Sequence, residues 1–252
     1  MKVVTVKGVA LGEGRPKICV PLVGCDIMAL QNEIERIREV NADLVEWRGD
    51  CYSGILDCDL MDKALALIRS GLPEMPILFT FRTIHEGGNR AVTWQEYLRL
   101  NRSVLDSGKA DLIDVESRGN REVVCELIAA AKENSVAVIA SNHDFERTPA
   151  VEEIQKRLEE QYLMGADIGK IAVMPQCRRD VITLLEATEA VSKASPIPII
   201  TMSMASDGLI SRMAGEVFGS CITFGSAVEA SAPGQIPVGE LKQVLEIIHR
   251  HL

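Results

Sequence analysis

The sequence predicts an α/β fold of the TIM (β/α)8 barrel type, a single domain over residues 1–252. Two observations lead to this prediction: eight short apolar runs rich in β-branched residues, and helical patterns between them. The runs are continuously apolar rather than alternating, which is typical of parallel strands covered on both faces. Eight such units in 252 residues match the size of a closed barrel.

The predicted strands follow one another along the chain at similar intervals. They span residues 17–23, 43–48, 76–82, 111–117, 136–141, 168–174, 197–204 and 221–225. We expect the first dozen residues to form a short N-terminal hairpin that closes the barrel bottom. An open doubly wound sheet is the alternative. It is less favoured because neither GxGxxG nor GxxxxGK[ST] occurs in the chain, and because eight near-equal units favour closure.

Helical patterns separate the strands. Apolar residues three or four apart, as in 151–162, form one stripe that a helix buries against the barrel. Thr93 and Glu96 predict a capping box at the start of one helix. Thr148 and Pro149 predict a cap and a first-turn proline for another.

Composition restricts the partners and the cellular location. The net charge of −9 argues against nucleic acid and anionic membrane as partners. The seven cysteines contain no CxxC pair, so we expect neither a disulfide framework nor a zinc site. Charged residues interrupt the N-terminal segment too early for a signal peptide, and no apolar run has transmembrane length. We therefore expect a cytoplasmic protein.

Polar side chains gather where the predicted strands end, which is where barrel enzymes carry their active sites. These residues are Glu46, Arg48, Arg82, Glu86, Glu116, His143, Asp144, Ser203, Arg212, Ser231 and Gln235. Arginines 48, 82 and 212 in an acidic protein predict a receptor for a carboxylate or phosphate. Alternatively, Glu46 and Glu116 pair with Arg48 and Arg82 and leave no anion site. We expect both to be partly true.

Lys170 stands near the start of an otherwise apolar run. A buried ammonium group needs partners, a path to the surface, or the loss of its proton. A neutral lysine attacks a ketone to form a Schiff base, and His143 could then remove the acidified proton beside the imine. We expect nearby arginines to help keep the amine neutral. These residues predict imine-based lyase or aldolase chemistry that needs no metal or cofactor; the alternative is a polar first residue of a strand.

Six segments of the chain, in order, carry a family resemblance. They are EWRGD (46–50), LFTFRTIHEGG (78–88), SNHDFERTP (141–149), KIAVMP (170–175), TMSMASDGLISRMAGEVFGS (201–220) and SAPGQI (231–236). Together they resemble type I 3-dehydroquinate dehydratase, the Schiff-base enzyme of the shikimate pathway, over essentially the whole length.

The resemblance implies a reaction and a role for each site residue. The reaction is the reversible syn dehydration of 3-dehydroquinate to 3-dehydroshikimate through an imine on Lys170. His143 would remove the C2 proton and then protonate the leaving hydroxyl, and Glu86 would orient His143. Arg212 would bind the substrate carboxylate. The other implied substrate-binding residues are Glu46, Arg48, Arg82, Ser231 and Gln235.

Further expectations concern the loops, the partners and rival functions. Residues 225–237 are long and rich in small side chains, which suits a lid. Met202 could contact the substrate or belong to the core. Gly169 replaces a proline that is common in the family, and we expect it to loosen the strand.

The family implies a homodimer. An imine-forming aldolase of the same fold is the alternative enzyme, and an inactive scaffold is disfavoured because no named group is missing.

Overall fold

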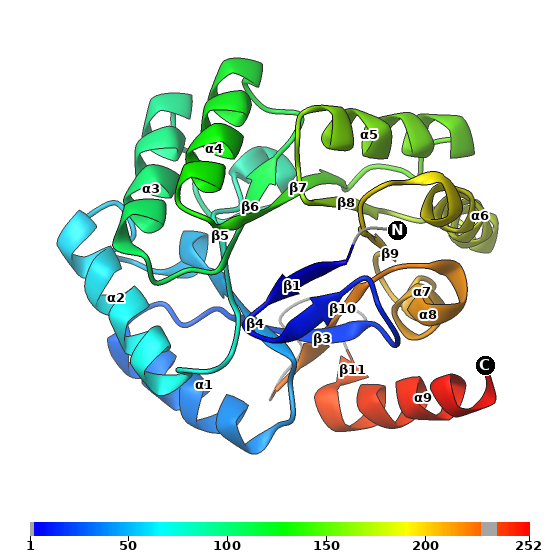
Figure 1. Cartoon of the computed structure of the whole chain (residues 1–252), viewed down its shortest axis with the longest axis horizontal. Coiled ribbons are helices and arrows are strands. Elements are labelled where there is room, and N and C mark those ends of the chain that lie inside the picture. The colour runs from blue at the N-terminus through cyan, green and yellow to red at the C-terminus, as the bar shows by residue number, and fades with distance from the viewer. Residues whose placement is uncertain (1–2, 228–235) are drawn as a thin grey trace.

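The computed structural model describes residues 3–227 and 236–252, and a parallel sheet curls around its centre (Figure 1). The strands of its wall are β3 (Lys17–Leu22), β4 (Leu44–Arg48), β5 (Ile77–Thr80), β6 (Leu112–Glu116), β7 (Ala137–Asp144), β8 (Ile168–Val173), β9 (Ile199–Ser203) and β10 (Ile222–Ser226). All eight predicted strands are present, each within a few residues of its expected bounds. The predicted TIM-type α/β fold is confirmed.

Neighbouring strands in the wall are parallel and follow the order β10-β3-β4-β5-β6-β7-β8-β9. Lighter pairing joins the two ends of this series. A single bridge connects Ile199 with Ser220, and the Cys221 N–H donates to the Ile199 carbonyl at 2.8 Å. The short strand β11 (Ile236–Pro237) pairs with β10 on the edge that faces away from β3.

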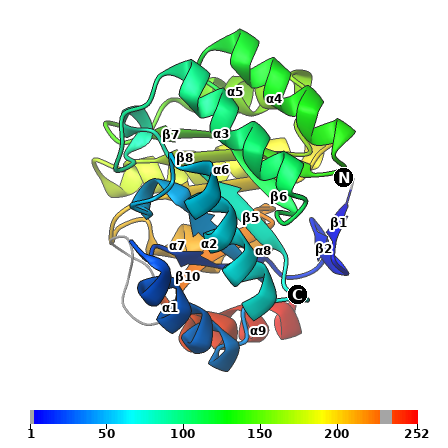
Figure 2. The ribbon, with the colours of Figure 1, turned by 90° about the vertical axis from the view of Figure 1, so that its left-hand side faces the viewer.

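Helices cover the outside of the wall (Figures 1 and 2). They are α1 (Ile27–Glu39), α2 (Cys58–Gly71), α3 (Trp94–Ser107), α4 (Arg121–Glu133), α5 (Val151–Leu163), α6 (Arg178–Ala194), α7 (Leu209–Met213), α8 (Gly215–Phe218) and α9 (Val238–His251). Two 3₁₀ turns, η1 (Gly49–Cys51) and η2 (Ile84–Glu86), follow β4 and β5. None of the described helices combines the length and the apolar character needed to cross a bilayer.

The start of α3 is confirmed as a capping box, whereas the predicted start of α5 is wrong. The Glu96 N–H donates to Thr93 Oγ1 at 3.2 Å, and Glu96 Oε2 accepts from the Thr93 N–H at 2.8 Å. By contrast, α5 begins at Val151, and Ala150 at its N-cap makes no side-chain cap. The Thr148 hydroxyl instead donates to the Met174 carbonyl at 3.1 Å, so it ties the loop to the end of β8.

Strand β7 extends three residues beyond the predicted end at 141. It stays paired with β8 as far as Asp144, which lies opposite Val173. Continued pairing satisfies the backbone groups of this segment, which a loop at this position would leave to other partners. His143 therefore lies on the strand itself rather than in the loop after it.

A hairpin closes the bottom of the barrel, as predicted. It consists of β1 (Val4–Val6) and β2 (Val9–Leu11), which are antiparallel. Lys7 and Gly8 at its tip both have positive φ, as a tight hairpin turn requires. Leu11 is 1% exposed and packs among interior residues from the lower parts of the strands, such as Leu44. Figure 2 shows the hairpin at one end of the barrel.

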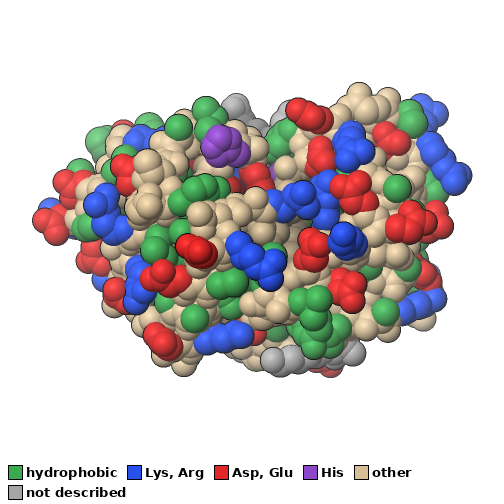
Figure 3. Space-filling model, turned by 90° about the horizontal axis from the view of Figure 1, so that it is seen from above, with side chains coloured by type: hydrophobic (Ala, Val, Ile, Leu, Met, Phe, Trp, Pro, Cys, Tyr) green, Lys and Arg blue, Asp and Glu red, His purple; other side chains and the backbone are tan. Residues whose placement is uncertain are grey.

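The surface seen in Figure 3 mixes charges of both signs. Lys and Arg side chains are interspersed with Asp and Glu side chains over this face. This face therefore presents no extended basic surface of the kind that nucleic acids bind.

Candidate active site

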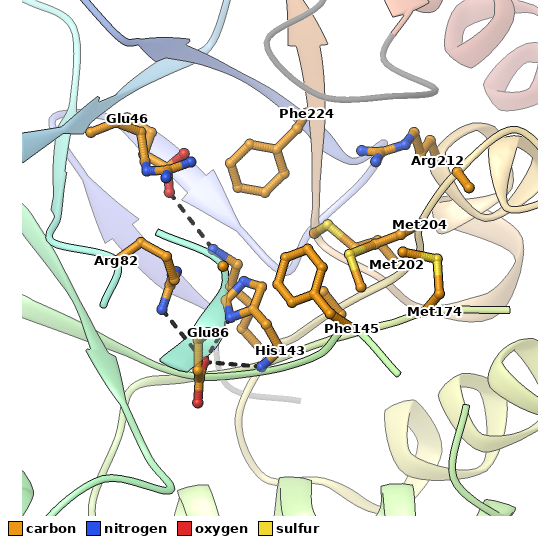
Figure 4. A pocket seen from close by; sticks show the side chains of 15 residues that line it. Glu46, Arg82, Glu86, His143, Phe145, Met174, Met202, Met204, Arg212 and Phe224 are labelled. Carbon is orange, nitrogen blue, oxygen red and sulfur yellow. Dashed lines mark hydrogen bonds and ion pairs between the residues drawn. The ribbon is translucent and has the colours of Figure 1, made fainter. Parts of the chain in front are cut away.

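A cavity of about 380 Å³ opens at the carboxyl ends of the barrel strands (Figure 4). This volume lies in the range of pockets that hold small molecules, roughly 300–1,000 Å³. Eight of the predicted site residues line it: Glu46, Arg48, Arg82, Glu86, His143, Lys170, Met202 and Arg212. The other two, Ser231 and Gln235, lie outside the described residues, as does most of the predicted lid.

Lys170 is the third residue of β8, is 3% exposed and reaches the cavity from the barrel interior. Its Nζ donates to Asp114 Oδ2 at 2.9 Å and lies 3.7 Å from Glu46 Oε1. The lysine is thus a buried group with partners rather than the polar first residue of a strand. The described ion pairs of Nζ are with these two carboxylates, and Asp114 also binds Arg82 at 2.9 Å. The expectation that nearby arginines help to keep the amine neutral stays a prediction.

His143, which is partly buried, and Glu86, which is buried, form a pair beside the lysine. Glu86 Oε2 lies 2.9 Å from His143 Nδ1 and accepts the His143 backbone N–H at 3.0 Å. Burial raises the pKa of Glu86 to about 7. Burial, together with the Arg82 and Lys170 charges, lowers the pKa of His143 well below its usual value. His143 is therefore neutral at neutral pH, and because Glu86 engages Nδ1, Nε2 is the nitrogen available to a ligand.

Two of the predicted arginines already hold carboxylates of the protein. Arg48 donates from Nε and Nη2 to the two oxygens of Asp50, both at 2.8 Å. Arg82 binds Glu116 at 3.1 Å, as the alternative interpretation predicted, and also Asp114 at 2.9 Å. The predicted pairing of Arg48 with Glu46 is wrong, because Asp50 in η1 accepts from both Nε and Nη2 of Arg48.

Arg212 differs from both. It is 5% exposed and lies on the cavity side opposite Arg82 and His143 (Figure 4). Among residues 3–227 and 236–252, no carboxylate lies within ion-pair distance of its guanidinium group, and its Nε has no hydrogen-bond partner. Burial lowers the pKa of Arg212. A buried cation with this environment is suited to receive an anionic ligand.

A family model for type I 3-dehydroquinase matches residues 18–251. The chain belongs to this family. It is 52% identical to the 3-dehydroquinate dehydratase of Listeria monocytogenes serotype 4b over 250 residues, which cover 99% of each chain. It is also 52% identical to the Bacillus licheniformis 3-dehydroquinate dehydratase over 252 residues, covering 100% of this chain and 99% of that one. The resemblance predicted from the six segments is confirmed.

The fold agrees with solved members of the type I 3-dehydroquinase family. The Clostridium difficile type I 3-dehydroquinate dehydratase, crystallised with covalently modified comenic acid, superposes with a TM-score of 0.97. It shares 44% sequence identity and covers 100% of this chain and 99% of its own. In the present chain, residues 3–227 and 236–252 contain no group of three His, Cys, Asp or Glu side chains that could hold a metal ion.

Sequence reasoning missed Asp114, the carboxylate closest to Lys170. It is 1% exposed in the middle of β6 and binds Arg82 through Oδ1 and Lys170 through Oδ2. Although burial opposes ionisation, the Arg82 and Lys170 charges hold the pKa of Asp114 below its usual value. The signal was available, because Asp114 interrupts an apolar run just as Lys170 does.

An apolar wall faces the charged side of the cavity and was also not predicted, apart from Met202. It contains Phe145, Met174, Met202, Met204 and Phe224 (Figure 4). Met202 is 9% exposed on β9, so it belongs to the core and to the cavity lining at once. Apolar residues at strand ends give no sequence signal that separates a pocket wall from the core.

Proposed function

We propose that this member of the type I 3-dehydroquinase family dehydrates 3-dehydroquinate to 3-dehydroshikimate through an imine on Lys170. The observation that carries the proposal is a buried lysine and a neutral histidine on neighbouring strands, lining one cavity. The covalently modified ligand of the C. difficile relative supports covalent chemistry in this family.

The ion pairs of Lys170 are compatible with imine formation. An ammonium group and a ketone combine to give a protonated imine and water, so the positive charge at nitrogen is conserved. Asp114 and Glu46 therefore stabilise the nitrogen before and after the reaction. Two protons must move from Nζ to the departing oxygen, because the ammonium group carries three hydrogens and the protonated imine carries one. Glu46 and His143 both line the cavity where these transfers happen.

The protonated imine acidifies the neighbouring C2 hydrogen. His143 Nε2 removes this proton, and the resulting enamine expels the β-hydroxyl group. The same nitrogen returns the proton to the leaving oxygen, so water departs from the face on which the proton was taken. Hydrolysis of the imine then releases 3-dehydroshikimate and restores Lys170. Glu86 holds Nδ1 and orients the ring throughout.

Arg212 is the proposed site for the substrate carboxylate because no described carboxylate pairs with it. Arg48 and Arg82, with Glu46, Ser231 and Gln235, are proposed to bind the ring hydroxyl groups and surround the carboxylate. Met202 contributes to the apolar wall against which the ring packs. Residues 225–237 are proposed to act as the lid.

The test is turnover of 3-dehydroquinate, followed by the ultraviolet absorbance of the conjugated enone product. Lys170→Ala should abolish turnover, and His143→Ala should lower kcat by about 100- to 10,000-fold, the usual contribution of a general base. Wild-type protein that forms no enone, or that cleaves a carbon–carbon bond as an aldolase would, contradicts the proposal.

We also infer that residues 1–252 form one catalytic domain that works in the cytoplasm as a homodimer on a small-molecule substrate. The net charge of −9 supports a partner other than nucleic acid or membrane. The homodimer rests on the family resemblance, and light scattering of the purified protein would measure its mass directly.

A further inference from the structure

Lys170 is held at its backbone as well as at its ammonium group. Gln161, on α5 outside the barrel wall, is 1% exposed. The Lys170 N–H donates to Gln161 Oε1 at 2.9 Å, and Gln161 Nε2 donates to the Lys170 carbonyl at 3.0 Å. One side-chain amide therefore engages both backbone groups of the residue that carries the nucleophile, which also pairs with Ser141 of β7 and Ile200 of β9.

The amide is itself anchored, and the anchoring chain returns to the lysine. Gln161 Nε2 also donates to Ser117 Oγ at 3.1 Å, and the Ser117 hydroxyl donates to the Ser141 carbonyl at 2.8 Å. The Ser141 hydroxyl donates to Asp114 Oδ1 at 2.5 Å, and Asp114 Oδ2 accepts from Lys170 Nζ. All these residues are buried. The ring thus runs from the backbone of Lys170 to its ammonium group.

Gly169 provides the space that this arrangement needs. A Cβ atom at residue 169 would lie 3.0 Å from Gln161 Oε1 and 3.3 Å from Leu158 Cδ2, so a side chain would press on the amide. Gly169 lies in a strand paired on both sides, with Ala140 and with Ile199. The absence of a side chain at residue 169 therefore leaves room for Gln161 to reach Lys170.

We propose that Gln161 is a positioning residue for imine formation, with the ring through Ser117, Ser141 and Asp114 fixing both ends of Lys170. This inference rests on the proposed imine at Lys170. Asp114 directs Nζ. Gln161 holds the backbone of Lys170 and so prevents it from shifting or rotating. Small displacements of a nucleophile from its attack geometry slow a reaction strongly. The amide is uncharged, so the backbone anchor is independent of pH.

The experiment is rapid-quench borohydride trapping of the imine with 3-dehydroquinate, combined with kcat and KM. The variants are Gln161→Leu, which removes the amide, and Gln161→Glu, which keeps an acceptor for the Lys170 N–H. Gln155→Leu is the matched control, because Gln155 lies half-buried on the same helix and makes no hydrogen bond to Lys170 among the described contacts.

Gln161→Leu should slow adduct formation and lower kcat by about tenfold, while KM changes by less than about twofold. Gln161→Glu should recover part of the loss, and Gln155→Leu should match the wild type. A Gln161→Leu protein that melts earlier but forms the adduct at the wild-type rate would show a merely structural role and overturn the proposal. If that variant does not fold, the rate of adduct formation is measured in Gln161→Glu and Gly169→Ala, which disturb the same amide. A wild-type rate in both would overturn the proposal. A wild type without any adduct would refute the imine itself.

Discussion

The pair formed by His143 and Glu86 determines when the cavity contains a base. Above about pH 7, Glu86 is ionised and accepts the Nδ1 hydrogen of His143, which leaves Nε2 unprotonated. Below this pH, Glu86 carries a proton and donates it to Nδ1, so the ring hydrogen moves to Nε2. We therefore expect kcat/KM, whose pH profile reports the pKa values of the free enzyme, to rise with pH through about 7.

Glu86→Gln tests this pH dependence. A carboxamide oxygen still accepts from Nδ1 but does not titrate, so the rise near pH 7 should disappear while measurable turnover remains. The measurement is the pH profile of kcat/KM for both proteins, with melting curves at each pH as the control. A rise near pH 7 that persists in Glu86→Gln would assign it to another group.

Arg212→Gln should raise KM by about 10- to 100-fold, because a charge-assisted hydrogen bond to the substrate carboxylate contributes roughly 1.5–3 kcal/mol. The effect on kcat should be smaller if the contact persists unchanged through the reaction. Arg179→Gln is the control, since Arg179 is exposed on α6. Equal KM values for the wild type, Arg212→Gln and Arg179→Gln would show that Arg212 does not bind the substrate.

Single residues could be predicted from the sequence where a polar side chain interrupts an apolar run or follows a strand. Lys170 interrupts the run of β8, His143 lies near the end of β7 and Arg212 follows β9, and all three line the cavity. Asp114 interrupts an apolar run as Lys170 does, and it was missed. Gln161 was missed because an uncharged amide on a helix has no pattern that distinguishes it from a surface residue.

At the scale of elements, α3 provides a prediction about its capping box. Thr93→Ala should lower the stability of the protein by about 0.5–2 kcal/mol, because the Glu96 N–H loses its acceptor. For a protein of this size, that corresponds to about 2–4 °C in Tm for each kcal/mol. KM and kcat should be unchanged, and a Tm equal to that of the wild type would mean that the cap contributes nothing.

Element boundaries were predicted less well than the elements themselves. The start of α5 was misplaced because the Thr148 hydroxyl bonds to the Met174 carbonyl, a tertiary contact that local sequence does not reveal. The end of β7 was placed too early because its last residues are polar and only the pairing with β8 keeps them in the sheet.

At the scale of the whole molecule, the barrel separates a stabilising bottom from a reactive top. Leu11→Ala should lower stability by about 2–5 kcal/mol, because it empties a buried volume among the lower strand residues. The kcat value should stay that of the wild type, since the cavity lies at the opposite end. A Leu11→Ala protein with wild-type stability but reduced kcat would contradict this division.

The barrel itself could be predicted because eight continuous apolar runs leave few other ways to bury them. The light pairing between β9 and β10 could not be predicted from the sequence, because closure of the barrel depends on the register of every strand in the wall. The convergence of Asp114, Glu46 and Lys170 likewise depends on register, since these residues come from three different strands.

The most direct test of the imine is borohydride reduction in the presence of 3-dehydroquinate, followed by intact mass and peptide mapping. We expect one substrate-derived adduct, confined to the peptide that contains Lys170 and absent from Lys170→Ala. A folded wild-type protein that gives no adduct, or an adduct on a different lysine, would contradict the assignment of Lys170 as the nucleophile.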